Sequence, residues 1–223
     1  MTTCMKLLGP VALVLVGALC VSGCGEQDLY EPPVSDYDVV GRGILPAEAL
    51  DVDIVGTTAF VAAGQGGLRA FDISNPANPT LLWALNTNRE ADFLRVERTY
   101  LPNGDFMDVA FVTQGTEGIH TFDASPGVPD SLRRISSAGT TAISANDLCV
   151  VLPEYRTDPY TVYLADTWKG IRVHFSDETL PGIIRYKNFV SSYGETQALD
   201  VVDGIAYVAD DQMGVTVINV RTV

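Results

Sequence analysis

The stretch Phe60-Val61-Ala62-Ala63-Gly64-Gln65-Gly66-Gly67-Leu68-Arg69-Ala70-Phe71-Asp72-Ile73-Ser74 decides the fold of this chain. It begins with a short apolar run, turns at a group of glycines, and continues as a second run that ends at a polar residue. Short runs rich in β-branched and aromatic residues, bounded by turn residues, predict buried strands. Glycine adopts positive φ without steric cost, so the glycines predict a tight turn between the two strands.

The same pattern recurs three more times. Its anchors are the glycines that open each second strand, which lie 51, 52 and 44 residues apart at Gly67, Gly118, Gly170 and Gly214. An aromatic residue stands seven positions before each anchor, at Phe60, Phe111, Tyr163 and Tyr207. A period of this length in short β-rich units is typical of a repeat array such as a β-propeller.

Two further strand types complete each unit. More polar segments, expected as outer strands, follow each polar stop at residues 81–85, 132–135 and 183–186. Expected inner strands precede each aromatic strand at residues 50–55, 93–96, 142–145 and 199–202. Four strands per unit make a propeller blade, so the sequence predicts an all-β, small β-propeller of four four-stranded blades.

The two ends of the domain suggest how the ring closes. The chain stops after the third strand of the fourth unit, at residues 215–220. Residues 38–45 have the outer-strand pattern and precede the first unit, so we expect this N-terminal strand to complete the last blade. Such closure removes exposed sheet edges. The alternative is an incomplete array whose open ends pair with another copy.

Residues 67–79 resemble the LVIVD repeat of exported bacterial proteins. That unit reads aromatic-Val-Ala-Asp, a short turn, Gly-Leu, an alternating strand, and then Asp-x-Ser-x-Pro. The strings Tyr163-Leu164-Ala165-Asp166 and Tyr207-Val208-Ala209-Asp210 match its first part. The resemblance covers nearly all of residues 37–223 and implies a β-propeller fold and export, with no general activity. The third copy departs at His174-Phe175-Ser176 and carries an insertion at residues 152–160.

The N-terminus predicts export and lipid anchoring. Lys6 and an apolar run fit a secretory signal over residues 1–23. Val21-Ser22-Gly23-Cys24 resembles the bacterial lipobox, in which the cysteine becomes the lipidated first residue. The alternative is an ordinary signal peptide that contains Cys24. Residues 24–36 read as a tether and residues 37–223 as the repeat domain, placing the protein in the cell envelope, at the outer membrane or cell surface rather than the inner membrane.

Composition narrows the partners. The formal net charge of −14 argues against nucleic acid and anionic lipid as ligands. Cys149 is the one cysteine that remains after lipidation, inside the apolar run 148–151, and is expected to be a small buried apolar group. We find no metal-binding histidine spacing, nucleophile elbow or phosphate loop, and we assign no catalytic residue.

One group of acidic residues predicts a cation site. The strings Ala49-Leu50-Asp51-Val52 and Ala198-Leu199-Asp200-Val201 both open an inner strand, and Asp92 holds a similar place in the second unit. Inner strands line the channel of a propeller, so Asp51, Asp92 and Asp200 are expected to converge, together with Ser144. Such carboxylates would suit a hard cation such as Ca²⁺. The alternative is that each aspartate caps backbone donors of the neighbouring blade.

Binding to a partner is expected in the loops that exceed the needs of the repeat. Tyr155, Tyr160 and Trp168 lie in or beside the long loops of the third unit. These features favour a non-enzymatic, membrane-anchored binding or scaffold module whose partner is a protein or a glycan. The alternative is a metal-dependent hydrolase or lactonase, which needs a metal with an open coordination position and a base beside it.

Overall fold

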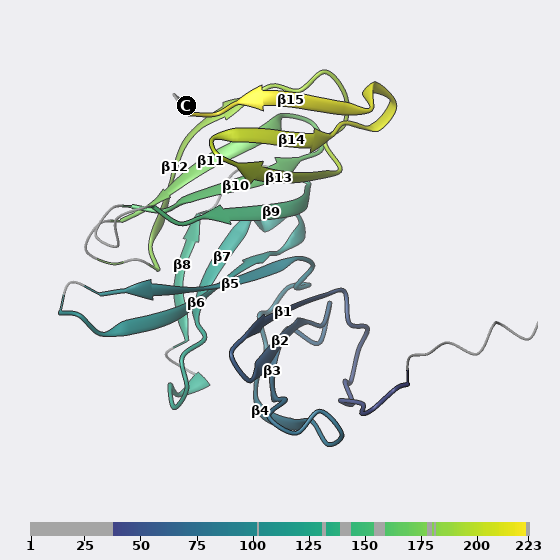
Figure 1. Ribbon diagram of the computed structural model, residues 1–223, viewed down its shortest axis with the longest axis vertical. Helices are drawn as coiled ribbons and strands as arrows, with labels where there is room; N and C mark the ends of the chain where they lie inside the picture. The colour runs from purple at the N-terminus through teal and green to yellow at the C-terminus, as the bar shows by residue number, and fades with distance from the viewer. Residues whose placement is uncertain are drawn as a thin grey trace, which may run out of the picture. The chain divides into compact units, whose positions relative to one another are not determined.

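The strands of this chain assemble as four antiparallel sheets (Figure 1). The structure is a computed structural model that describes residues 38–221 except 102, 131–132, 139–143, 154–158, 178–179 and 181. Contacts divide the chain into Met1–Val39 and Val40–Val223, and the second unit holds every described strand. The expected signal peptide, Cys24 and the tether lie outside the described residues. Among the residues described, no helix could span a bilayer.

Within the part of the chain that the structure describes, each of the first three sheets is a four-stranded meander and the fourth has three strands. Sheet 1 contains β1 (Asp51–Val55), β2 (Thr58–Ala62), β3 (Leu68–Asp72) and β4 (Thr80–Leu85). Sheet 2 contains β5 (Leu94–Tyr100), β6 (Phe106–Thr113), β7 (Ile119–Asp123) and β8 (Arg134–Ala138). Sheet 3 contains β9 (Ala145–Val151), β10 (Thr161–Asp166), β11 (Gly170–Ser176) and β12 (Ile184–Val190). Sheet 4 contains β13 (Ala198–Val202), β14 (Ile205–Ala209) and β15 (Val215–Asn219). The predicted division into four blade-like units is confirmed.

The four anchor glycines all have positive φ, between 74° and 88°. At Gly67 a side chain would also meet the carbonyl oxygen of Leu85 on β4, and at Gly170 it would meet that of Val190 on β12. At Gly67 and Gly170 the turn therefore requires glycine for two reasons: the backbone conformation disfavours a Cβ, and the outer strand leaves no room for one. The positive φ, which all four anchors share, explains why glycine recurs at this position of every unit.

The hydrophobic core is divided among the spaces between consecutive sheets. Sheets 2 and 3 each turn one face to the sheet before and the other face to the sheet after, as the alternation of side chains along a strand allows. The first cluster joins sheets 1 and 2 and includes Phe60, Leu68, Leu94 and Phe122. The second joins sheets 2 and 3 through Phe111, Ile119, Leu148 and Leu164. The third joins sheets 3 and 4 through Tyr163, Ile171, Leu199 and Val208.

The inner strand of the third unit differs from the prediction. Residues 142–145 were expected to form it, but β9 spans Ala145–Val151 and pairs Cys149 with Tyr163. The reason is that the apolar run 148–151 pairs with β10, with Leu148 opposite Leu164 and Val150 opposite Val162. The strand therefore contains the apolar run around Leu148 and begins just after Ser144.

The predicted closure through residues 38–45 is not formed. These residues belong to no strand, and within the described residues β15 has a hydrogen-bonded neighbour on one side only. Residues 40–45 instead lie against sheet 1, where a side chain on Gly41 would meet the backbone of Pro76 and one on Gly43 would meet the ring of Phe71. The segment packs on the sheet that is nearest to it in sequence.

Candidate functional site

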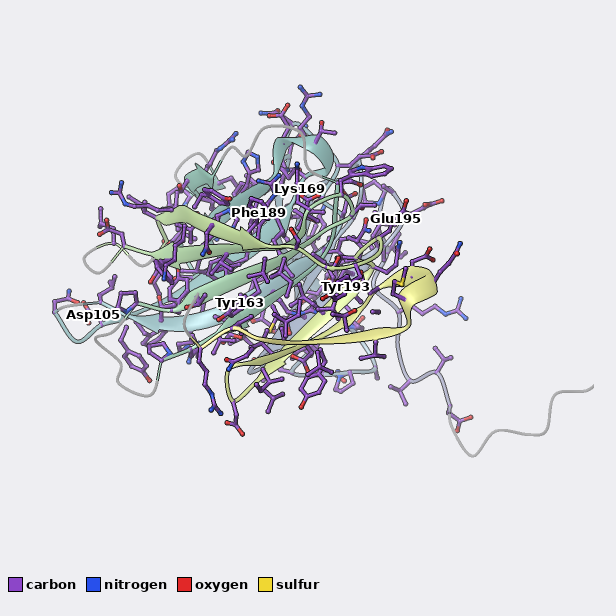
Figure 2. All side chains as sticks on the ribbon, turned by 90° about the horizontal axis from the view of Figure 1, so that it is seen from above. Asp105, Tyr163, Lys169, Phe189, Tyr193 and Glu195 are labelled. Atoms are coloured by element: carbon purple, nitrogen blue, oxygen red, sulfur yellow. The ribbon has the colours of Figure 1, made fainter. Side chains whose placement is uncertain are left out.

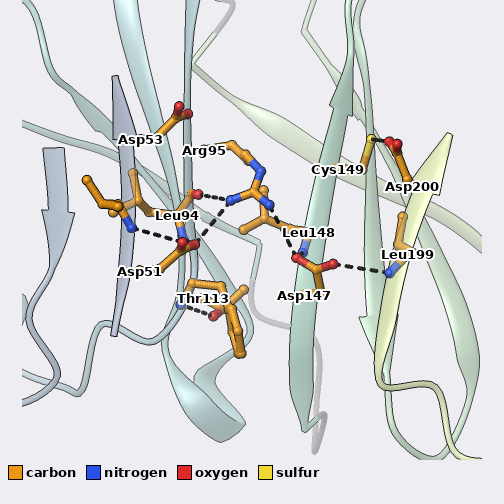
Figure 3. A network of polar contacts seen from close by, with 12 residues as sticks. Asp51, Asp53, Leu94, Arg95, Thr113, Asp147, Leu148, Cys149, Leu199 and Asp200 are labelled. Carbon is orange, nitrogen blue, oxygen red and sulfur yellow. Dashed lines mark hydrogen bonds and ion pairs between the residues drawn. The ribbon is translucent and has the colours of Figure 1, made fainter. Parts of the chain in front are cut away.

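A line of polar contacts crosses the inner strands of all four sheets (Figure 3). Asp51 Oδ2 on β1 accepts hydrogen bonds from the backbone N–H of Leu94, at 2.9 Å, and from Arg95, at 3.1 Å. The Arg95 guanidinium also lies 3.6 Å from Asp147 on β9. Asp147 Oδ2 in turn accepts the N–H of Leu199 on β13, at 3.1 Å. The inner strands are thus joined by carboxylates and one guanidinium.

Three aspartates use their two oxygens in the same way, and we call Asp51, Asp53 and Asp147 the clamp aspartates. Oδ1 accepts the N–H of the following residue, at 2.8–2.9 Å. Oδ2 accepts an N–H of the next sheet, which is Val96 for Asp53, at 2.7 Å. Hydrogen bonds to an ionised acceptor are stronger than neutral ones. The clamp aspartates therefore fix sheet 1 against sheet 2 and sheet 3 against sheet 4, while the ion pair of Arg95 with Asp147 joins sheets 2 and 3.

The structure does not bring Asp51, Asp92 and Asp200 together as a group of metal ligands. Asp92 accepts the N–H of Gly115 at 3.0 Å, and burial raises the pKa of its carboxyl group. Asp200 Oδ1 accepts the N–H of Val201 at 2.8 Å and lies 3.6 Å from the sulfur of Cys149. Among the described residues, no three acidic, histidine or cysteine side chains are arranged to hold a metal ion. Asp51 instead has the alternative role, because it binds a backbone donor of the neighbouring sheet.

The register of the inner strands explains this correction. Asp51 pairs with Ala62, five residues before its anchor glycine, whereas Asp200 pairs with Tyr207, seven residues before its anchor. The two identical strings therefore place their aspartates at different depths. Asp147, which the sequence analysis missed, pairs with Ala165 and is the true equivalent of Asp51. An aspartate immediately before the apolar run 148–151 was the signal that could have identified it.

All tight turns at the anchor glycines lie at the same end of their sheets. In a four-stranded antiparallel meander, the last strand ends beside the turn between the second and third strands, so the connections from β4 to β5 and from β12 to β13 also start at this end. We call the turns at the anchor glycines and these connections together the turn rim. Three large hydrophobic side chains are exposed on the rim of sheets 3 and 4: Trp168 (71% exposed), Tyr193 (84%) and Met213 (61%). Figure 2 shows Tyr193 and Glu195 far from Asp105, which lies in the β5–β6 turn at the other end.

The rim of sheets 1 and 2 is more polar and encloses a cleft of about 590 Å³. The cleft lies among the β2–β3 turn, the β4–β5 connection and η1 (Gly115–Glu117), and its walls include Gln65, Asn88, Arg89 and Gln114. Gln114 is buried and its Oε1 has no hydrogen-bond partner within the described residues. This oxygen can accept a hydrogen bond from a bound group.

Asp210 occupies the equivalent place in sheet 4, four residues before its anchor glycine and directly before η3 (Asp211–Met213). Its Oδ2 accepts the N–H groups of Tyr193 and Gly194, both at 3.0 Å, and the hydroxyl of Thr216 at 2.8 Å. Burial opposes ionisation, but the hydrogen bonds from Ser192, Thr216 and these N–H groups outweigh it and lower the pKa of Asp210. The buried carboxylate thereby holds the loop that presents the Tyr193 side chain.

The predicted partner-loop residues have three different outcomes. Trp168 is exposed on the turn rim. Tyr160 is instead 3% exposed, and its ring packs edge-on against Phe111 at 5.4 Å between centroids, so it belongs to the core between sheets 2 and 3. Tyr155 lies outside the described residues.

Cys149 is partly buried, and burial raises the pKa of its thiol to about 11, consistent with an inert packed side chain.

The chain contains an LVIVD repeat, which matches residues 46–87. Among solved structures, it is similar to the computationally designed Ika4 protein, with 15% identity and a TM-score of 0.53 over 83% of this chain and 99% of that protein. It is also similar to a candidate 6-phosphogluconolactonase from Bacteroides uniformis, with 17% identity and a TM-score of 0.56 over 76% of this chain. The matched part spans 49% of that protein, about half its length. These likenesses support a β-propeller-like fold and nothing finer. No curated protein matches the sequence.

Proposed function

We propose that the chain is an exported, lipid-anchored protein of the cell envelope whose propeller-like domain is a non-enzymatic binding module for another protein. The observation that carries this proposal is the group of large side chains exposed on the turn rim, Trp168, Tyr193 and Met213. Trp, Tyr and Met are enriched in protein interfaces, and Trp and Tyr dominate the residues that contribute most binding energy.

The loops that carry these side chains are held in place, which favours recognition. Asp210 holds the backbone at Tyr193 by accepting its N–H. Asp166 accepts a hydrogen bond from the N–H of Trp168 at 3.0 Å and also forms an ion pair with Arg172. A site that is already ordered loses less conformational freedom on binding. The polar cleft near Gln114, on the rim of sheets 1 and 2, adds hydrogen-bonding groups.

Site-specific photo-crosslinking in intact cells tests the binding site. A photoreactive residue at position 168 or 193 is expected to yield the same crosslinked partner, and position 103, in the β5–β6 turn, serves as the control. Trp168→Ala should remove the crosslink formed from position 193. A partner captured equally well from position 103, or a crosslink unaffected by Trp168→Ala, would contradict the proposed site.

The anchor requires a separate measurement, because Cys24 lies outside the described residues. Its basis is the apolar segment that ends in Val21-Ser22-Gly23-Cys24. Mass spectrometry of the mature N-terminus should find an acylated Cys24, and Cys24→Ala should release the protein from the membrane fraction. A mature chain that begins at another residue would refute the lipid anchor. The binding site on the turn rim is tested separately, by the crosslinks from positions 168 and 193.

A further inference from the structure

Two apolar sheet faces are partly exposed at opposite ends of the array, although Val61 and Phe71 on the first of them are buried. The head face lies on sheet 1 and includes Val52 and Ile54, which are 57% and 56% exposed. The tail face lies on sheet 4 and includes Tyr207, Val215 and Val217, which are between 48% and 69% exposed. Monomeric proteins seldom leave contiguous faces of this kind in water.

These faces are the two halves of an interface that the chain already builds. Relative to the anchor glycines, Tyr207, Val215 and Val217 correspond to Tyr163, Ile171 and Val173 of sheet 3. Those three side chains are at most 7% exposed, because sheet 4 covers them. The tail face is therefore the sheet 3 side of that contact, without its cover.

The head face of sheet 1 corresponds to the face of sheet 4 that covers sheet 3. Val52 and Ile54 hold the register positions of Leu199 and Val201, since Val52 pairs with Val61 as Leu199 pairs with Val208. Leu199 and Val201 pack against sheet 3 in the third core cluster. Sheet 1 thus has the side chains that would cover the tail face of sheet 4, but sheet 1 lies at the opposite end of the array from sheet 4.

The open edge of β15 requires the same neighbour. In sheets 1 to 3 an outer strand pairs with the third strand, whereas within the described residues the outer edge of β15 is unpaired. Residues 40–45 lie against the outer part of sheet 1, beside Phe71. They come directly before the inner strand β1, just as the outer strands β4, β8 and β12 come directly before the inner strands β5, β9 and β13. A sheet 1 that docks on the tail face would therefore bring residues 40–45 to the edge of β15.

We propose that a second copy of this chain supplies that neighbour, so that two copies associate head to tail through two equivalent contacts. A contact between different surfaces closes into a ring when each copy uses its head face and its tail face once. Both unpaired faces and both β15 edges are then covered. This assembly is independent of the partner site proposed on the turn rim.

One pair of side chains opposes the contact. Asp200 lies 3.6 Å from Cys149 across the interface between sheets 3 and 4. In the proposed contact, Asp200 takes the place of Cys149, and Asp53 takes the place of Asp200, because these positions share one register. Two carboxylates would then be neighbours, and like charges at this distance repel. Asp200→Asn is therefore expected to tighten the dimer.

The test measures the mass of the purified full-length chain by native mass spectrometry and sedimentation. We expect a dimer, and Val52→Lys or Val217→Lys should each raise the dimer dissociation constant by about 100-fold or more, because a lysine would be buried without a partner. Leu82→Lys, an exposed position on β4, is the matched control and should leave the dimer intact. Circular dichroism confirms that each variant is folded.

Mixing the variants distinguishes this arrangement from others. Val52→Lys keeps an intact tail face and Val217→Lys an intact head face, so an equimolar mixture should regain dimers through one contact, whereas neither variant alone does. A monomeric parent protein would overturn the proposal, whether its ring closes within one chain or its faces bind a different protein. A dimer unaffected by both lysines, or a mixture that stays monomeric, would also overturn it.

Discussion

The guanidinium of Arg133 lies 4.0 Å above the ring of Trp83 and links sheet 2 to sheet 1. Arg133 is 2% exposed, and it donates hydrogen bonds to the carbonyl oxygens of Asp123 and Ser125 and to the carboxylate of Asp130. A buried arginine is stable only when its donors are satisfied and its plane is packed. The contact therefore contributes to the cohesion of the first two sheets.

Replacement of Arg133 tests this contact. Arg133→Lys keeps the charge but loses the planar stack and some of the donors, so the free energy of unfolding should fall by about 1–3 kcal/mol. Arg185→Lys is the control, because Arg185 is an exposed ion-pair partner of Asp177 and should change stability by less than about 0.5 kcal/mol. Urea unfolding measures both. Equal losses in the two variants would contradict the role of Arg133.

The clamp aspartates should be structural. Asp147→Ala leaves the N–H of Leu199 without its acceptor and removes an ion-pair partner of Arg95, so it should lower the free energy of unfolding by about 2–3 kcal/mol. Glu48→Ala, at an exposed position before β1, is the control and should be nearly neutral. Chemical denaturation is again the measurement, and an unchanged midpoint for Asp147→Ala would refute the clamp.

Acid should destabilise the protein through His174. Burial, and then the charge of Arg172, lower the pKa of this fully buried histidine to about 4. The unfolded chain therefore binds more protons than the folded one between pH 6.5 and 4, so the stability present above pH 6.5 is lost as the pH falls. The loss by pH 5 is about 2 kcal/mol.

His174→Phe removes the titrating group and keeps an aromatic ring beside Tyr186. The difference in unfolding free energy between pH 7 and pH 5 should therefore be smaller in this variant by about 2 kcal/mol. Part of the difference should remain, because burial also lowers the pKa of His120. Denaturant titrations at the two pH values provide the comparison, and an identical pH dependence in the variant would exclude His174 as the cause.

The anchor glycines offer a test of crowding. Gly67→Ala should cost more than about 2 kcal/mol, because positive φ is unfavourable for alanine and its Cβ would meet the carbonyl oxygen of Leu85. Gly56 also has positive φ, but a Cβ there would meet nothing within 4 Å. Gly56→Ala should therefore cost only about 1 kcal/mol. Thermal and urea unfolding would show no difference between the two if crowding were unimportant.

The repeat could be recognised from sequence because each unit depends on local rules. Gly67 and its equivalents need positive φ, and Phe60 and its equivalents lie on short apolar strands bounded by turns, so both leave a pattern in the sequence. The depth of Asp200 and the burial of Tyr160 depend instead on strand register and on an insertion. Whether sheet 4 meets sheet 1 depends on the geometry between sheets, on which composition and periodicity carry no information.

The two-residue offset between Asp51 and Asp200 has a consequence for how such a chain can diverge. A strand that slides by two residues along its neighbour still turns the same side chains to the same face, because side chains alternate with a period of two. A shift by one residue would exchange the core and solvent faces. When a change in connection length is absorbed by a register shift of the strand, the shift should therefore be an even number of residues. A repeated peptide can then occupy different register positions while the same side chains still face the core.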